Sequence, residues 1–235
     1  MLRLSIPAQD KRGRHQLMKY SVIASGSKGN AVVIEDVILI DCGVSYKSIR
    51  PYVPSLKLVL LTHEHGDHFR ESTIRRLANE RPTLRFGCGA WLVKWLLACG
   101  VSRYVIDVYD MDTYYQYSRF GIEAFCLYHN APNCGYKIFM AGRKALYATD
   151  TCKIETEAND YDLYMIEANY DDDELKERIN RKEAEGATYI NELVVPENHL
   201  SRAAATEWLM KNMGPDSEYI FMHVHEEQTY EGQTD

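Results

Sequence analysis

Apolar residues along the chain are grouped in short runs, most of them four to seven residues long, that are bounded by polar or turn-forming positions. Runs of this length favour β-strands, and the continuous ones are typical of strands covered on both faces. We expect strands at residues 20–25, 30–36, 37–43, 56–62, 83–88, 113–120, 122–130, 136–142, 144–150, 161–170 and 218–227.

Four other segments have the spacing of amphipathic helices. They cover residues 68–80, 90–100, 172–186 and 201–214. The first places Ile74 and Leu77 on one face, and the third begins with acidic residues, as the helix dipole favours. Strands, then a few helices, then strands and helices again predict an α+β fold in which two sheets form a sandwich with helices outside.

Composition indicates an ordinary globular protein: 46% of the 235 residues are hydrophobic and 26% are charged. This length suits one domain, which we expect from Met18 to residue 235, whereas residues 1–17 are expected to be a loose arm or an extension upstream of the natural start. No apolar run approaches the roughly 18 residues of a membrane span. The six cysteines form no CxxC pair, which favours free thiols in a reducing cytoplasm.

The stretch "LTHEHGDHF" concentrates candidate metal ligands directly after the expected strand 56–62. Residues two apart on an extended segment point the same way, so His63, His65 and Asp67 should project together. Gly66 is expected to allow a sharp turn, after which His68 reaches the same cavity as Asp67. Imidazole and carboxylate are ligands typical of zinc and neighbouring first-row ions, so this stretch predicts a metal site.

Further candidate ligands stand where other apolar strands give way to polar loops. These are His129, Asp150 and, in "YIFMHVH", His223, with His225 as the alternative. Seven ligands exceed what one tetrahedral ion accepts, so the sequence predicts two divalent ions with a carboxylate between them. Zinc is favoured, with manganese or iron as alternatives.

The ordered set of His63, His65, Asp67, His68, His129, Asp150 and His223 resembles the metallo-β-lactamase superfamily, and the resemblance covers the chain from Met18 onward. It implies a four-layer αββα sandwich with a two-metal site at the sheet edges. "SVIASGSKGNAVVIED", "LIDCG", "IEANYD" and "NHLSRAAA" are similar to the YycJ/WalJ-type branch of DNA exonucleases, which is related to tRNA 3′-processing endonucleases. The segment between Glu167 and His199 is longer than this branch's pattern.

Carried over residue by residue, the resemblance implies that His63, His65 and His129 bind one ion, that Asp67, His68 and His223 bind the other, and that Asp150 bridges them. It also implies that Asp67 orients the attacking water, that His199 donates a proton to the leaving oxygen, and that Glu167 orients His199. Asp41 is expected to accept a hydrogen bond from a ligand histidine, or else to be a turn residue.

Substrate contacts are less narrowly defined by the sequence. The turn with Ser25, Ser27 and Asn30 offers backbone donors to a phosphate, or is only a turn. Arg70 and Arg75, together with Arg76, Arg81 and Arg85, follow the metal motif and would track a phosphate backbone, or form a solvated helix face.

We therefore expect a cytoplasmic two-metal phosphodiesterase that acts on nucleic acid, with single-stranded DNA or DNA ends favoured. The net charge of −7 gives no overall attraction to nucleic acid, which supports the alternative of cyclic nucleotides or other small phosphodiesters. A metal-binding regulatory subunit without turnover and a thioester or lactam hydrolase are further alternatives on the same fold. No membrane partner is expected, and a homodimer is left open.

Overall fold

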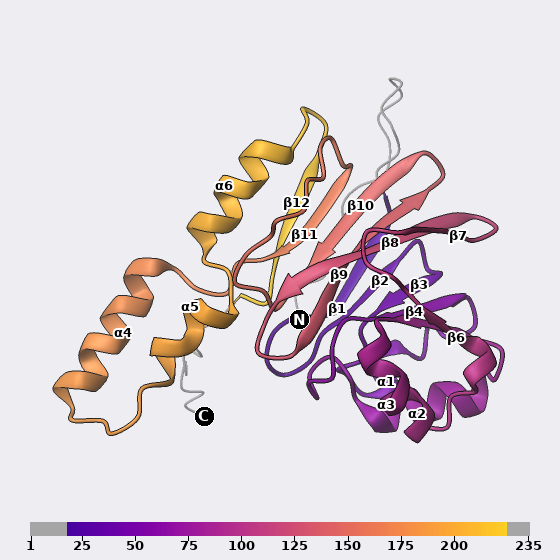
Figure 1. Ribbon diagram of the computed structural model, residues 1–235, viewed down its shortest axis with the longest axis horizontal. Coiled ribbons are helices and arrows are strands. Elements are labelled where there is room, and N and C mark those ends of the chain that lie inside the picture. The colour runs from indigo at the N-terminus through magenta and orange to yellow at the C-terminus, as the bar shows by residue number, and fades with distance from the viewer. Residues whose placement is uncertain (1–17, 225–235) are drawn as a thin grey trace, which may run out of the picture.

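Two β-sheets pack face to face at the centre of the molecule, with helices against their outer surfaces (Figure 1). The computed structural model describes residues 18–224. The expected arm at 1–17, the end of the last predicted strand and His225 therefore lie outside the described residues. Within the described range, no helix is both long enough and apolar enough to cross a membrane. The arrangement confirms the predicted four-layer αββα sandwich.

The first sheet is antiparallel at one side and parallel at the other. Its strands, in spatial order, are β1 (Tyr20–Ala24), β2 (Ala31–Ile34), β3 (Ile38–Ile40), β4 (Leu58–Leu61), β5 (Arg85–Cys88) and β6 (Ile106–Val108). The strands from β3 to β6 run parallel, so their carboxyl ends share one edge of the sheet.

The second sheet repeats this mixture of directions. Its spatial order is β12 (Glu218–Met222), β11 (Leu163–Glu167), β10 (Arg143–Ala148), β9 (Pro132–Met140), β8 (Phe120–Tyr128) and β7 (Tyr114–Gln116). β10, β11 and β12 are parallel, and β8 has the same direction because both β8 and β10 are antiparallel to β9.

Alternation along the strands explains the four layers. Leu58 and Leu60 of β4 lie in the core between the sheets, whereas Val59 and Leu61 pack under the helices of the first half. The same alternation in β10 and β11 divides their side chains between the central core and a third core beneath the helices of the second half. Strands buried on both faces therefore appear in the sequence as continuous apolar runs.

The helices of the first half are α1 (Tyr46–Ile49), α2 (Glu71–Glu80) and α3 (Val93–Ala98), which cover the outer face of the first sheet. The helices of the second half are α4 (Asp172–Ala184), α5 (Val195–Asn198) and α6 (Arg202–Asn212). Short 3-10 turns occupy Ala90–Leu92, Arg103–Val105 and Asn191–Val194. α6 packs on the second sheet through Ala205 and Leu209.

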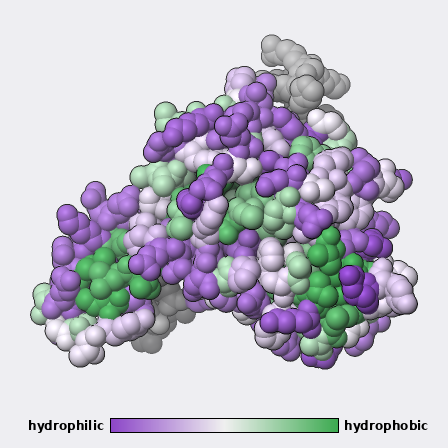
Figure 2. Space-filling view, viewed as in Figure 1, coloured by the Kyte–Doolittle hydropathy of each residue, from purple (hydrophilic) through white to green (hydrophobic). Residues whose placement is uncertain are grey.

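The segment with α4 and α5 projects from the sandwich (Figure 1). Hydrophobic colour gathers on it in Figure 2, and Tyr189, Leu193 and Val194 are among its exposed side chains. Its two ends are joined at the base, where Asn169 N donates to Leu200 O at 2.9 Å. The residues between Glu167 and His199 thus form the projection, and the chain on either side of it is held together at the base.

The sequence prediction was wrong at several element boundaries. The helix after the metal motif begins at Glu71 and not at residue 68, because His68 and Phe69 form a turn with His65 O. The expected strand 113–120 is reduced to Tyr114–Gln116, and the expected helix at 90 begins as a 3-10 turn. β6, α1 and α5 were not predicted, since each is only three or four residues long.

Candidate metal centre

The candidate ligands gather at one edge of the sandwich, just beyond the carboxyl ends of strands from both sheets. Asp41 follows β3, His63 follows β4, His129 follows β8, and Asp150 and His223 come after β10 and β12. Glu167 is the last residue of β11. Strands that end at one edge bring residues distant in sequence to one crevice, which is where α/β sheets bind ligands.

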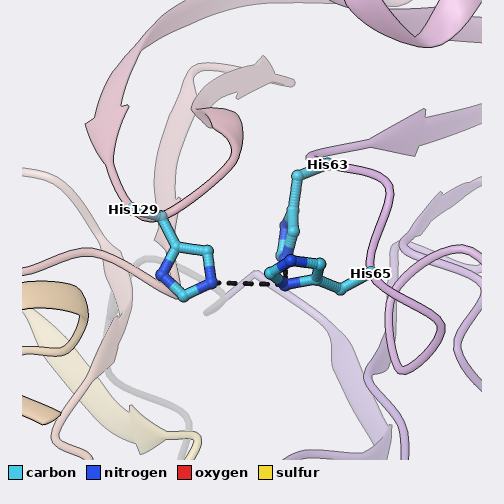
Figure 3. A group of neighbouring side chains, drawn as sticks. All are labelled: His63, His65 and His129. Carbon is cyan, nitrogen blue, oxygen red and sulfur yellow. Dashed lines mark hydrogen bonds between the residues drawn. The ribbon is translucent and has the colours of Figure 1, made fainter. Parts of the chain in front are cut away.

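His63, His65 and His129 form the first group of ligands, and Figure 3 shows their rings converging from two loops. His65 Nδ1 lies 3.1 Å from His63 Nε2 and 3.3 Å from His129 Nε2. Nitrogen ligands about 2.0–2.1 Å from one tetrahedral ion lie roughly 3.3 Å apart, so the spacing fits a shared ion.

Outer hydrogen bonds leave two of the three converging nitrogens, those of His63 and His129, without protons. His63 Nδ1 lies 3.0 Å from the Thr62 hydroxyl, which itself donates to Asp41 Oδ1 at 3.1 Å. His129 Nδ1 lies 3.0 Å from the carbonyl oxygen of Asn198 and donates its proton there. With both Nδ1 atoms acting as donors, the Nε2 atoms of His63 and His129 keep a lone pair for a metal.

His68 stands between two carboxylates in the buried part of the centre. Its Nδ1 donates to Asp41 Oδ2 at 2.7 Å, and its Nε2 lies 2.9 Å from Asp150 Oδ2. Asp150 Oδ2 is buried and has no hydrogen-bond partner among the described residues. If both His68 Nε2 and Asp150 Oδ2 presented only lone pairs, they would repel each other at this distance in a buried site. Either a metal ion or a proton on His68 is needed near them.

The second group of candidate ligands is more open. Asp67 Oδ2 lies 3.6 Å from His68 Nε2 and 3.9 Å from His223 Nε2. Two ligands held about 2.1 Å from one ion are separated by at most roughly 4.2 Å, so Asp67 is close enough to share an ion with either histidine. The two histidines themselves fall into different groups: His68 lies with His63 and Asp150, and His223 lies with Asp150, Glu167 and His199. Asp150 Oδ1 is 3.9 Å from His129 Nε2 and 3.5 Å from His223 Nδ1, which places this carboxylate between the two groups.

Electrostatics across the centre follow from burial and from these carboxylates. Burial lowers the pKa of His63 to about 2, and His68 adds to the effect, so the imidazole is neutral. Burial opposes the charge on His68 as well, but Asp150 and Asp41 outweigh it and hold the pKa of His68 well above its usual value. Imidazoles and carboxylates gathered in this way are ligands suited to divalent ions, and the His/Asp clusters indicate divalent-metal binding.

Glu167 and His199 meet beside the second group, although they are 32 positions apart in sequence. His199 Nδ1 donates to Glu167 Oε1 at 2.6 Å, and His223 Nδ1 lies 3.1 Å from the same oxygen. Glu167 Oε2 accepts from the backbone N–H groups of Thr151 and Leu200 at 2.8 and 3.3 Å. One fixed carboxylate therefore orients two histidines of the centre.

Three residues of the centre have left-handed backbone conformations. The φ angles are 60° at Asp41, 58° at Asp150 and 52° at His223. Aspartate and histidine tolerate this region better than most residues, but it still costs on the order of 1–3 kcal/mol where the surrounding structure enforces it. Each kink turns the chain sharply at a strand end, so that the side chain faces the crevice.

A close backbone contact fixes the metal loop, and no sequence pattern predicted it. A Cβ added to Gly43 would lie 1.5 Å from the backbone oxygen of Asp67, so only glycine fits there. Gly66 has no such neighbour within 4 Å and no positive φ, so the turn at Gly66 does not require glycine. Thr62 was also missed; its only signal was a hydroxyl residue at the end of an apolar strand.

The expected substrate-binding residues have mixed surroundings. Ser25 Oγ accepts from the backbone N–H of His223 at 2.7 Å, and Asn30 is buried with its amide nitrogen 2.8 Å from His68 Nε2. Both therefore contact histidines of the centre, whereas Ser27 is exposed and contacts none of them within residues 18–224. Arg75 lies 3.5 Å from Glu71, and Arg70 makes no side-chain hydrogen bond or ion pair within residues 18–224.

Comparison with known proteins places the chain in a family. Residues 37–224 match the description "Beta-lactamase superfamily domain". The exodeoxyribonuclease WalJ of Streptococcus pneumoniae is 26% identical over an alignment 233 residues long. The alignment covers 89% of this chain and 82% of WalJ. The chain therefore belongs to the beta-lactamase superfamily, and its similarity to WalJ is consistent with the YycJ/WalJ-type branch.

Solved structures agree on the fold. The metallo-beta-lactamase fold protein YhfI from Bacillus subtilis superimposes with a TM-score of 0.67 at 16% identity, covering 89% of this chain and 87% of YhfI. The short form of human tRNase Z gives a TM-score of 0.64 at 15% identity, with 87% and 92% covered. At these identities the likeness is evidence for the shared fold alone.

Proposed function

We propose that the protein is a phosphodiesterase that uses two divalent metal ions and acts on nucleic acid, with single-stranded DNA or DNA ends as the favoured substrate. The observation that carries the proposal is the position of Asp150. Its carboxylate lies between the three-histidine group and the residues Asp67, His68 and His223, with one buried oxygen 2.9 Å from His68 Nε2 and the other 3.9 Å from His129 Nε2 and 3.5 Å from His223 Nδ1.

In this proposal His63, His65 and His129 would hold one ion, Asp67, His68 and His223 would hold the other, and Asp150 would be shared by both. Two such ions supply Lewis-acid stabilisation of phosphoryl oxygens and a readily deprotonated water when bound. Asp67 is the partly exposed carboxylate of the set, with 24% of its side chain accessible, and it accepts a hydrogen bond from the attacking water.

Proton delivery to the leaving oxygen is assigned to His199. Its Nδ1 is committed to Glu167 Oε1, so Nε2 is the atom that transfers the proton. Glu167 fixes the ring orientation and stabilises the protonated imidazole, while its second oxygen stays bound to two backbone N–H groups. The side chain of His199 is 19% exposed, which leaves the ring accessible to substrate.

The choice of DNA is supported by the relative named exodeoxyribonuclease, and a nucleic-acid substrate in general by the tRNase Z fold neighbour. A second candidate is hydrolysis of cyclic nucleotides or other small phosphodiesters. The net charge of −7 favours it, as do the acidic partners of Arg75, Arg76 and Arg85.

A substrate panel with metal-loaded protein tests the proposal. The panel holds labelled single- and double-stranded DNA, RNA, cyclic nucleotides and bis(p-nitrophenyl) phosphate. Faster turnover of DNA, weakening steeply with salt, is the expected result, since polymer binding releases counterions. Salt-insensitive turnover of cyclic nucleotides with no DNA cleavage would establish the second candidate. No hydrolysis of any phosphodiester would exclude both.

A further inference from the structure

A cavity of about 390 Å³ opens beside His129, between the turn that follows β8 and the short helix α5. Its lining includes Tyr128, His129, Asn130, Pro132, Cys152 and Glu197. The volume falls in the range of roughly 300–1,000 Å³ that is common for small-molecule sites. His129 belongs to the metal centre, whereas Tyr128, Asn130 and Glu197 have no part in the chemistry described so far.

One wall of the cavity is built onto the loop that carries Asp150. Tyr128 N donates to Thr151 Oγ1 at 2.9 Å, and Cys152 N donates to Tyr128 O at 2.9 Å. The Tyr128 ring is also fixed, because its hydroxyl donates to Glu155 and the Lys153 ammonium lies 4.0 Å from the ring centroid. The ring is therefore held in a set position relative to the bridging carboxylate.

The opposite wall is joined to the other reacting groups. The Asn198 carbonyl that accepts from His129 Nδ1 at 3.0 Å is flanked in sequence by Glu197, which lines the cavity, and by His199. A group in the cavity would thus lie next to a phosphate at the metal centre, on the side from which His199 approaches. Because Glu197, Asn198 and His199 are consecutive residues, the backbone sets the distance between the cavity and the metal centre.

The lining favours a neutral ring over a second phosphate. Within residues 18–224 no lysine or arginine lines this cavity, the Lys153 ammonium beside the Tyr128 ring is paired with Glu155, and Glu197 would repel an anion. An aromatic ring offers a surface for stacking, and the Asn130 amide and Glu197 carboxylate offer hydrogen bonds. A planar heterocycle with N–H donors satisfies all three groups.

We propose that this cavity binds the nucleobase attached to the scissile phosphate and prefers guanine to thymine; the proposal rests on the nucleic-acid function proposed above. Guanine presents two adjacent donors, N1–H and N2–H, to the two oxygens of one carboxylate. Thymine presents a single N3–H between two carbonyl oxygens, which the Glu197 carboxylate repels. Glu197 is accordingly the residue that determines base preference, and Tyr128 supplies stacking to either base.

The test measures binding of the nucleosides 2′-deoxyguanosine and thymidine by ligand-observed NMR, because nucleosides carry no phosphate and need neither metal nor turnover. Wild-type protein should bind deoxyguanosine roughly 5- to 150-fold more tightly than thymidine, the range for a bidentate contact. Glu197→Gln should remove this preference. Tyr128→Leu should weaken both nucleosides by a similar factor, and Glu183→Gln, an exposed acid on α4, should change neither.

Equal affinity for the two nucleosides in the wild type, or an unchanged preference in Glu197→Gln, would overturn the base subsite. A melting temperature equal to that of the wild type establishes that each variant is folded. Hydrolysis of bis(p-nitrophenyl) phosphate, which has no base, reports separately on the proposed function. If the wild-type protein does not hydrolyse this compound but still prefers guanine, the phosphodiesterase is rejected and the subsite is kept. If it hydrolyses the compound but shows no guanine preference, the subsite alone is rejected.

Discussion

Among the described residues 18–224, the His199 imidazole has one strong side-chain partner, Glu167, at 2.6 Å, whereas Glu167 also holds His223 and two backbone N–H groups. Substitution of His199 is therefore the cleaner way to remove the proposed proton donor. We predict that His199→Ala keeps its metal ions and slows cleavage of DNA by roughly 10²- to 10⁴-fold. The loss should be much smaller for a nitrophenyl phosphodiester, whose leaving group barely needs a proton. Steady-state kinetics on both substrates check this, and an equal loss on both would assign His199 a structural role.

Gly43 offers a second test on a single residue. Its contact with the Asp67 backbone leaves no room for a methyl group, so Gly43→Ala must displace either β3 or the metal loop. Overpacking of this kind lowers the free energy of unfolding by about 1–3 kcal/mol, and here it should also reduce the metal content of the protein. Thermal unfolding and elemental analysis measure the two effects. Gly66→Ala, in open space in the same loop, is the matched control and should change neither.

Helix α2 carries the arginines nearest to the metal motif, and its internal contacts distinguish among them. Arg76 pairs with Glu80 at 2.7 Å and lies over the Tyr46 ring, whereas Arg70, at the start of the helix, has no such partner within residues 18–224. We predict that Arg70→Gln weakens binding of single-stranded DNA and lowers the salt slope by about 0.7, as expected for one lost phosphate contact. Arg76→Gln should have no effect. Fluorescence anisotropy across a salt series measures both, and an unchanged slope for Arg70→Gln would support a small substrate.

For the molecule as a whole, the ligand groups draw on both sheets, so metal binding should stabilise the entire sandwich. We predict two ions per chain and a higher melting temperature with metal than with a chelator. An ion present at 100 times its Kd adds about 2.7 kcal/mol. His63→Ala should lose most of this gain, because His63 belongs both to the three-histidine group and to the group that it forms with His68 and Asp150. Elemental analysis with scanning calorimetry checks the prediction; one ion per chain or none would contradict it.

The sequence predicted the sandwich and the candidate ligands because both depend on local patterns. Apolar runs defined the buried strands, and His129, Asp150 and His223 were noticeable as polar residues at the ends of such runs. Asp41 and Glu167 were expected to orient histidines of the centre, but the backbone partners described next were not predictable. The Asn198 carbonyl is 69 positions from His129, and the base of the α4–α5 projection, which brings His199 to Glu167, is made by backbone contacts. Such partners depend on tertiary packing that no short window of sequence encodes.

The left-handed backbone at Asp41, Asp150 and His223 has a consequence for how this protein can change over evolution. At each position, glycine would relieve backbone strain while deleting a side chain of the centre. Selection for activity and selection for stability therefore oppose each other at these three positions. A descendant freed from catalysis would gain stability by accepting glycine there. Glycine at position 150 or 223 would thus mark a relative that has kept the sandwich and abandoned its chemistry.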